Sequence, residues 1–163
     1  MTKFLLGIAI VAFTSFIGFI FAKKYRQRKL FFVQLKEFND RFLSEITYYR
    51  RPIGEFISKC VYKGEFDTFL RNYFYYLNDM QSDIEEISFD CCEFLTKEQK
   101  SVVSDYFQML GKGDSSSQRA YYTAMKEPLT KLYLETDASY KKYGDLYVKL
   151  GFLCGLLILI LII

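Results

Sequence analysis

Two long uncharged stretches, one at each end of the 163-residue chain, constrain the fold more than any other feature. Residues 4–22 contain no charge, and neither do residues 150–163. The segment between them holds 21 of the 22 basic residues and all 19 acidic residues. This distribution predicts a transmembrane helix over 1–23, a polar globular domain over 24–145 and a second transmembrane helix over 146–163. It argues against both a soluble enzyme and a multi-spanning transporter.

The first stretch is long enough to cross a bilayer. As a helix it extends about 28 Å, against roughly 30 Å of hydrocarbon. A cleaved signal peptide is the main alternative, but its shorter apolar core normally ends in a small-x-small site. Here Ile20 stands two positions before Ala22, which fits such a site poorly. We therefore interpret the stretch as a retained anchor.

The second stretch is short, because its 14 residues give only about 21 Å of helix. Counting from Leu146 adds one turn that includes Tyr147 and Lys149. The lysine stem can reach the headgroups from inside the bilayer, while tyrosine prefers the interface. A buried amphipathic helix is the alternative, but the stretch has no polar face. We interpret it as a span that ends at the far surface.

Basic residues next to the first stretch predict the orientation. Five of them follow it within seven positions: Lys23, Lys24, Arg26, Arg28 and Lys29. The positive-inside rule places such residues, and therefore the polar domain, in the cytoplasm. The lysines that precede the second span agree. We expect this basic collar (residues 23–29) to contact lipid headgroups, and its position at the membrane disfavours nucleic acid as a partner.

The polar domain has helical spacing almost throughout, which predicts an all-α fold. Its first helix carries one apolar stripe with steps of three or four residues: Phe31, Leu35, Phe38, Phe42, Ile46 and Tyr49. Further helices are predicted from Pro52 to about Tyr62, over 66–80, over 83–94, from Thr96 to Leu110, and from Ser116 or Ser117 toward the membrane. Pro128 should kink the last of these helices or break it near Lys126. We expect a compact bundle of about six helices between the two membrane helices.

Catalytic and metal-binding patterns are missing. The sequence has no histidine, which excludes Ser-His-Asp and Cys-His catalysis and imidazole ligands. The adjacent Cys91 and Cys92 do not match a C-x-x-C site, so we interpret them as small apolar residues on a buried helix face. No pair of carboxylates suggests acid–base catalysis. We expect no cofactor and no metal.

A glycine-rich stretch at 111–117 resembles a phosphate loop only superficially. A phosphate loop needs the spacing G-x-x-x-x-G-K-[ST] after a strand, whereas this stretch follows a predicted helix. Gly111 instead suits the position after a helix that ends at Leu110, and Asp114 or a following serine suits the N-cap of the next helix. We therefore predict a structural turn.

Acidic residues concentrate in one part of the polar domain. Residues 72–114 hold nine acids and three bases. Four of the acids have the spacing of one helix face, if the helix that contains residue 79 continues to residue 90: Asp79, Asp83, Glu86 and Asp90. A solvated surface is one interpretation. The other is a docking surface for a basic partner, because complementary charge steers association.

The chain resembles the stage III sporulation protein AB family of endospore-forming bacteria along its whole length. The matching segments, in order, are AKKYRQR at 22–28, LSEITY at 43–48 with PIGEF at 52–56, LGKGD at 110–114 with Gln118, and YGDLYVKLG at 143–151. The family patterns are L-x-x-E-I-x-Y…P-L-x-E-A, L-G-x-x-D-x-x-x-Q and Y-x-x-L-G. Phe56 replaces a small residue of the family pattern, and residues 83–95 match it poorly.

The resemblance implies a non-enzymatic platform subunit. Members have a cytoplasmic helical domain similar to the F domain of type II secretion and type IV pilus platform proteins. They belong to the channel complex between mother cell and forespore, and the implied partner is a mother-cell ATPase, stage III sporulation protein AA, besides other subunits. The resemblance also places Gly111, Asp114 and Gln118 in one family turn and the chain in the mother-cell membrane that faces the forespore.

Two alternatives to this function stay open on the sequence. One is a generic secretion or pilus platform subunit unrelated to sporulation. The other is a membrane-anchored sensor or enzyme that uses the acidic face or Cys91 and Cys92. Assembly of the chain into a homo-oligomer is compatible with each of these functions.

Overall fold

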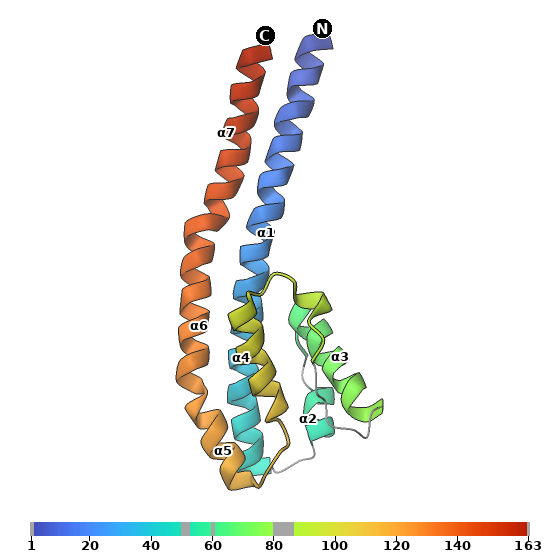
Figure 1. Ribbon diagram of the computed structural model, residues 1–163, viewed down its shortest axis with the longest axis vertical. Coiled ribbons are helices and arrows are strands. Elements are labelled where there is room, and N and C mark those ends of the chain that lie inside the picture. The colour runs from blue at the N-terminus through green and yellow to red at the C-terminus, as the bar shows by residue number, and fades with distance from the viewer. Residues whose placement is uncertain (1, 50–52, 60, 80–86, 163) are drawn as a thin grey trace. The chain divides into compact units, whose positions relative to one another are not determined.

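The computed structural model describes residues 2–49, 53–59, 61–79 and 87–162. Within these ranges the chain is helical and contains no strand, which confirms the all-α class (Figure 1). The α-helices are α1 (Thr2–Ser44), α2 (Ile53–Lys59), α3 (Glu65–Asp79), α4 (Lys97–Gln108), α5 (Ser115–Ala124), α6 (Lys126–Ser139) and α7 (Asp145–Ile162). Two π-helical turns, η1 (Glu45–Tyr49) and η3 (Tyr140–Gly144), and one 3-10 turn, η2 (Asp90–Cys92), complete the elements.

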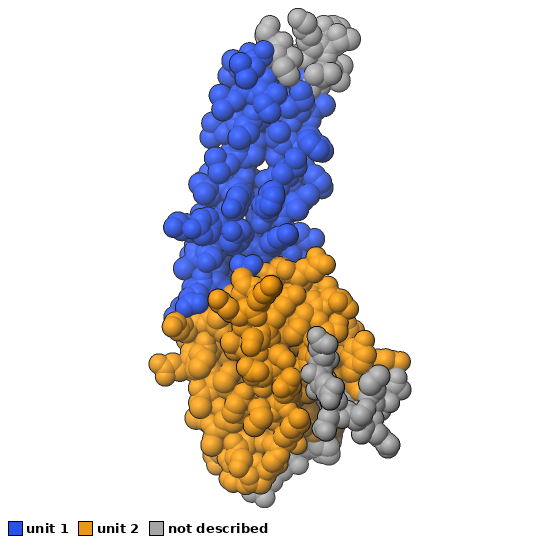
Figure 2. All heavy atoms as spheres, in the orientation of Figure 1, with its two compact units in different colours: residues 1–29, 134–163 blue, residues 30–133 orange. Residues whose placement is uncertain are grey.

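The chain forms two compact units (Figure 2). Unit 1 comprises residues 1–29 and 134–163, and unit 2 comprises residues 30–133. Helix α1 therefore contributes its first part to unit 1 and the rest to unit 2. Two helical stretches, 7–49 and 115–161, are long and apolar enough to cross a membrane. The exact ends of the spans remain a prediction.

Aromatic rings form the core of unit 2. The predicted stripe on α1 is correct up to Phe42, since Phe31, Leu35, Phe38 and Phe42 are all fully or almost fully buried. Edge-to-face contacts join α1 to the other helices, for example Phe31 to Phe66 at 5.2 Å between ring centroids and Phe42 to Tyr122 at 4.9 Å. Such geometry adds stability beyond the buried area. The helical spacing of the sequence therefore predicts the part of the core that α1 supplies.

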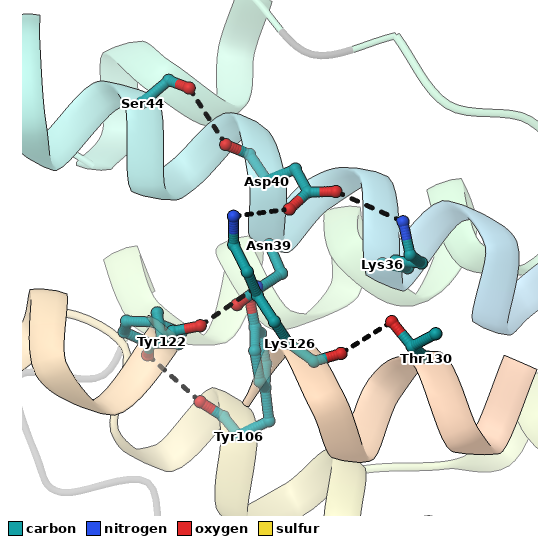
Figure 3. A network of polar contacts seen from close by, with 8 residues as sticks. All are labelled: Lys36, Asn39, Asp40, Ser44, Tyr106, Tyr122, Lys126 and Thr130. Atoms are coloured by element: carbon teal, nitrogen blue, oxygen red, sulfur yellow. Dashed lines mark hydrogen bonds and ion pairs between the residues drawn. The ribbon is translucent and has the colours of Figure 1, made fainter. Parts of the chain in front are cut away.

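A buried asparagine joins three helices inside this core (Figure 3). The Asn39 amide donates to the Tyr122 carbonyl at 3.1 Å, and the Tyr106 hydroxyl donates to the Asn39 side-chain oxygen at 3.1 Å. The Tyr122 hydroxyl donates to the Tyr106 carbonyl at 3.2 Å. All three side chains are almost completely buried. Because water does not reach these buried polar groups, they satisfy one another's hydrogen bonds. The network therefore favours one arrangement of α1, α4 and α5.

Charged residues continue this network toward the surface (Figure 3). Asp40, next to Asn39, forms ion pairs with Lys36 at 3.5 Å and with Lys126 at 3.4 Å. Both pairs are substantially exposed, so each contributes little to stability.

Three sequence expectations are wrong, and one is close. The helix predicted from Pro52 to about Tyr62 is shorter, because α2 ends at Lys59 and residues 61–63 are not helical. The helix predicted over 83–94 is not observed in its described part, because residues 87–89 lie outside any helix and residues 90–92 form only the 3-10 turn η2. Tyr49, expected on the buried stripe, is 64% exposed, because the π-helical turn η1 changes the phase of the stripe. The predicted break near Lys126 occurs at Met125, between α5 and α6.

Candidate functional site

Glycines bring α1 and α7 into close contact in unit 1. A Cβ atom added at Gly151 would lie 2.7 Å from the Thr14 carbonyl oxygen, and one added at Gly155 would lie 2.8 Å from the Val11 Cα. A side chain at Gly18 would likewise collide with the backbone of α7. In lipid, helices associate through such backbone approaches at small residues. The spacing Gly151-x-x-x-Gly155 thus serves a contact within the chain.

A tyrosine cluster continues this contact next to the basic collar. Tyr25 on α1 lies 5.5 Å from Tyr143 and 5.7 Å from Tyr147, measured between ring centroids, and Phe21 stacks on Tyr147 at 5.7 Å. Tyrosines are typical of the membrane–water interface, because the ring is apolar and the hydroxyl is polar. The cluster lies where the sequence places the ends of both predicted spans.

One carboxylate joins the two helices of unit 1 beyond the tyrosines. The Asp137 carboxylate forms ion pairs with Lys141 at 2.8 Å and with Lys29 at 2.7 Å. These hydrogen bonds, first that of Lys141 and then that of Lys29, lower the pKa of Asp137 below its usual value. Lys29 also lies over the Tyr140 ring at 5.0 Å. Lys29, predicted as a topology signal and a headgroup contact, thus also connects α1 to α6.

The turn after α4 has the geometry of a cap. Gly111 has a φ of +81°, the left-handed region that glycine adopts most easily. Asp114 is the N-cap of α5: its carboxylate accepts from the Ser116 hydroxyl and from the Ser117 backbone amide, and these bonds lower its pKa to about 2. The Gln118 amide donates back to the Lys112 carbonyl at 3.2 Å. Every one of these bonds stays within the turn.

A model of the stage III sporulation protein AB family matches residues 3–163 of the chain. The chain belongs to this family. Membership supports a role in sporulation. Comparisons with curated proteins and with solved structures give no match.

In this member of the family, the predicted acidic stripe is only partly described. Helix α3 ends at Asp79, while Asp83 and Glu86 lie outside the described residues. Asp90 is exposed and accepts a hydrogen bond from the Ser88 hydroxyl at 2.8 Å. Since Asp90 stands in η2 and residues 87–89 are not helical, a single helix face that carries all four acids is not observed. Their role in docking stays a proposal.

The cysteine pair of the family member lies in η2, at the edge of the aromatic core, and not on an α-helix as expected. Cys92 is fully buried, Cys91 partly so, and their sulfur atoms are 3.5 Å apart. Burial raises the pKa of both thiols. They therefore stay protonated at neutral pH, which disfavours both nucleophilic attack and metal binding. Within the part of the chain that the structure describes, no group of three or more histidine, cysteine, aspartate or glutamate side chains could hold a metal ion.

Among the contacts that sequence reasoning missed are one in unit 1 and a pocket in unit 2. The first is the glycine contact, which G-x-x-x-G signals but whose partner helix the motif does not identify. The second is a pocket of about 550 Å³ between α2 and α3, where Arg71 and Asp67 form an ion pair at 2.7 Å beside an apolar floor. The floor comes from Ile57, Leu70 and Phe74. Because faces of two separate helices must meet to form it, no linear pattern predicts the pocket.

Proposed function

We propose that the protein is a non-enzymatic membrane platform subunit of the channel complex between mother cell and forespore, and that it docks a cytoplasmic ATPase there. The observation that carries the proposal is the family match over residues 3–163. Two further features support it: helices apolar enough to cross a membrane, and a separate helical unit with its own aromatic core.

The proposed topology has two spans with residues 24–145 in the mother-cell cytoplasm. The basic collar supports this orientation. It is tested with Lys112→Cys, an exposed position, in a background without the native cysteines. An impermeant thiol reagent should leave this cysteine unlabelled in intact mother cells and label it after lysis. A cysteine at Lys3 should react in both, and the reverse pattern would rule out the orientation.

The proposed docking surface is the acidic segment with Asp79, Asp83, Glu86 and Asp90. It has the charge that a basic surface on stage III sporulation protein AA would need. Reversing Asp83, Glu86 and Asp90 to lysine should weaken co-purification of the ATPase with the detergent-solubilised chain. The loss should resemble the effect of high salt, since exposed charges are screened beyond about 8 Å at physiological ionic strength. The melting temperature should hardly change.

A matched control reverses three acids in other parts of the chain that are exposed, Asp105, Glu127 and Glu135, with the same change in net charge. The control should retain the ATPase. Equal binding by both triple variants would remove the acidic segment as the docking surface. The basic residues Arg41, Arg50 and Arg51 would then be the next candidates. Failure of the parent chain to retain the ATPase in sporulating cells would contradict the docking role itself.

A further inference from the structure

The pocket between α2 and α3 in unit 2 has an apolar floor (Figure 1). Ile57 and Leu70 belong to the buried core, and Phe74 is a partly buried ring that packs against it. The volume of about 550 Å³ lies in the range of roughly 300–1,000 Å³ that is typical of ligand sites. An apolar floor that stays in contact with water favours a large apolar group as the occupant.

A guanidinium stands at the rim of this pocket. The Arg71 Nε donates to the Asp67 carboxylate at 2.7 Å, one helical turn away. The arginine side chain is 78% exposed, against 24% for the aspartate. Within the described residues, the two Nη atoms of Arg71 have no partner. Asp67 thus holds the arginine in place through one N–H group, and the four N–H groups on the Nη atoms remain for a ligand.

An exposed tyrosine extends the contact surface beyond the pocket. Tyr75 lines the pocket, is 66% exposed, and its ring lies 6.0 Å from that of Tyr76 between centroids. Tyrosine and arginine are enriched among the residues that contribute most to protein–protein binding. Their presence around a pocket at the surface favours a protein segment over a free small molecule, which an enclosed cavity would bury more completely.

We propose that this pocket binds a segment of a partner protein in which a large apolar side chain stands next to a carboxylate. The apolar side chain lies on the floor of the pocket, and the carboxylate accepts parallel hydrogen bonds from the Nη atoms of Arg71. A carboxylate is the complementary group because its two oxygens match the fork of a guanidinium. The inference goes beyond the proposed function, since the proposed ATPase surface is acidic and needs a basic partner.

The test uses the full chain in lipid nanodiscs and two capped dipeptides, titrated by fluorine NMR. The acidic probe is acetyl-para-fluorophenylalanyl-glutamyl amide, and the neutral probe has glutamine in place of glutamate. The parent should bind the acidic probe about 5-fold more tightly, which corresponds to about 1 kcal/mol for an exposed ion pair. Arg71→Gln should abolish this preference.

A second variant fills the pocket. Gly54 lines it, and a Cβ atom added there would meet nothing within 4 Å, so a larger side chain can enter the pocket without displacing the fold. Gly54→Leu should weaken the binding of both probes about tenfold or more, because the leucine takes up the space of the ring.

Matched controls lie in α5. Arg119→Gln removes the same charge, and Ala120→Leu adds a leucine at an exposed helix position. Both should bind the two probes as the parent does. The melting temperatures of all four variants should stay near that of the parent, since every changed position is exposed.

Three results would overturn the proposal. Absence of binding, or equal affinity of the parent for the two probes, would remove Arg71 as a ligand of a carboxylate. Equal binding by Gly54→Leu and the parent would place the probes outside the pocket. Tighter binding of para-fluorophenylbutyrate, a free acid with the same two groups, would assign the pocket to a small molecule. Because the ATPase takes no part in the titration, each of these results leaves the proposed function unchanged.

Discussion

Units 1 and 2 are both helical, but different contacts hold each of them together. Unit 1 brings backbones together at Gly151 and Gly155, whereas unit 2 packs phenylalanine and tyrosine rings around α1. The difference fits two solvents. In water, burying a large ring is favourable, but in lipid there is no hydrophobic driving force between helices, so close packing and polar contacts must join them. One helix, α1, takes part in both kinds of packing, since it belongs to both units.

The strongest test of the comparison removes a ring from unit 2. Phe38→Ala should lower the free energy of unfolding of this unit by about 3–5 kcal/mol, because Phe38 is fully buried and the substitution leaves a cavity. Chemical denaturation of the detergent-solubilised chain, followed by near-ultraviolet circular dichroism, measures the loss. Tyr48→Ala, at an exposed site, is the control and should stay within about 0.5 kcal/mol of the parent. Equal effects would contradict the assignment of the core.

The corresponding test in unit 1 adds a side chain. Gly151→Leu should separate α1 from α7 at a cost of about 1–3 kcal/mol, because the new side chain meets the Thr14 carbonyl. Disulfide formation between cysteines placed at Gly7 and Leu159, with the native cysteines replaced, reports the pairing. Gly54→Ala in unit 2, where a Cβ meets nothing within 4 Å, is the control and should leave the cross-link unchanged. Full cross-linking in Gly151→Leu would show that the glycine contact is dispensable.

A third test concerns the polar contact inside unit 2. Asn39→Ala leaves the Tyr106 hydroxyl and the Tyr122 carbonyl buried without their partner, so it should destabilise unit 2 by about 1–3 kcal/mol. The double variant Asn39→Ala/Tyr106→Phe should recover part of that loss, since it removes one of the orphaned groups. Additive losses in thermal unfolding would indicate that the two residues act independently.

A smaller effect is expected at the turn before α5. Gly111→Val should cost about 1 kcal/mol or more, because valine resists a φ of +81° and its Cβ would lie 2.7 Å from Ile53. Asp114→Ala should also lower the melting temperature, through loss of the cap. Neither change should create or remove nucleotide binding. Nucleotide binding by the parent that Asp114→Ala abolishes would favour a phosphate loop.

The smallest effect is the response to acid. Asp137 in unit 1 and Asp114 in unit 2 both have pKa values below the usual 3.8, that of Asp114 at about 2. Their stabilisation is complete above the unfolded-state pKa and is lost as the pH falls through the lower folded-state pKa. Asp137→Asn should therefore reduce the acid dependence of the Gly7–Leu159 cross-link, while Asp114→Asn should reduce that of unit 2 unfolding. An exchange of these two effects would contradict the division into units.

The sequence predicted those parts of the fold in which buried residues recur with helical spacing along one helix. Phe31, Leu35, Phe38 and Phe42 could be assigned to the core because their spacing alone reveals a buried face. The phase change at η1 could not be predicted, since a π-helical turn has no clear sequence signal, and it exposes Tyr49. The helix expected over 83–94 failed for a related reason. Tertiary burial of Ile87, Cys92 and Phe94 needs apolar side chains, but it does not need a helix.

The contacts that join distant segments were less predictable than the helices themselves. Asn39 follows Phe38 as an ordinary polar residue, and only its position opposite Tyr106 and Tyr122 reveals its role. The charge of Lys29 was visible in the sequence, but its partner Asp137 was not. A local pattern such as the N-cap of α5 needs no distant partner, and the sequence narrowed it to Asp114 or a following serine, of which the structure shows Asp114.

The glycine contact of unit 1 also limits how the gene can change. Gly18 and Gly151 lie far apart in the coding sequence, yet each faces the backbone of the other helix. A larger residue at either position is tolerated only if the facing helix moves away or carries a smaller residue opposite it. Neutral changes at the two codons are therefore coupled, although the polar domain is encoded between them.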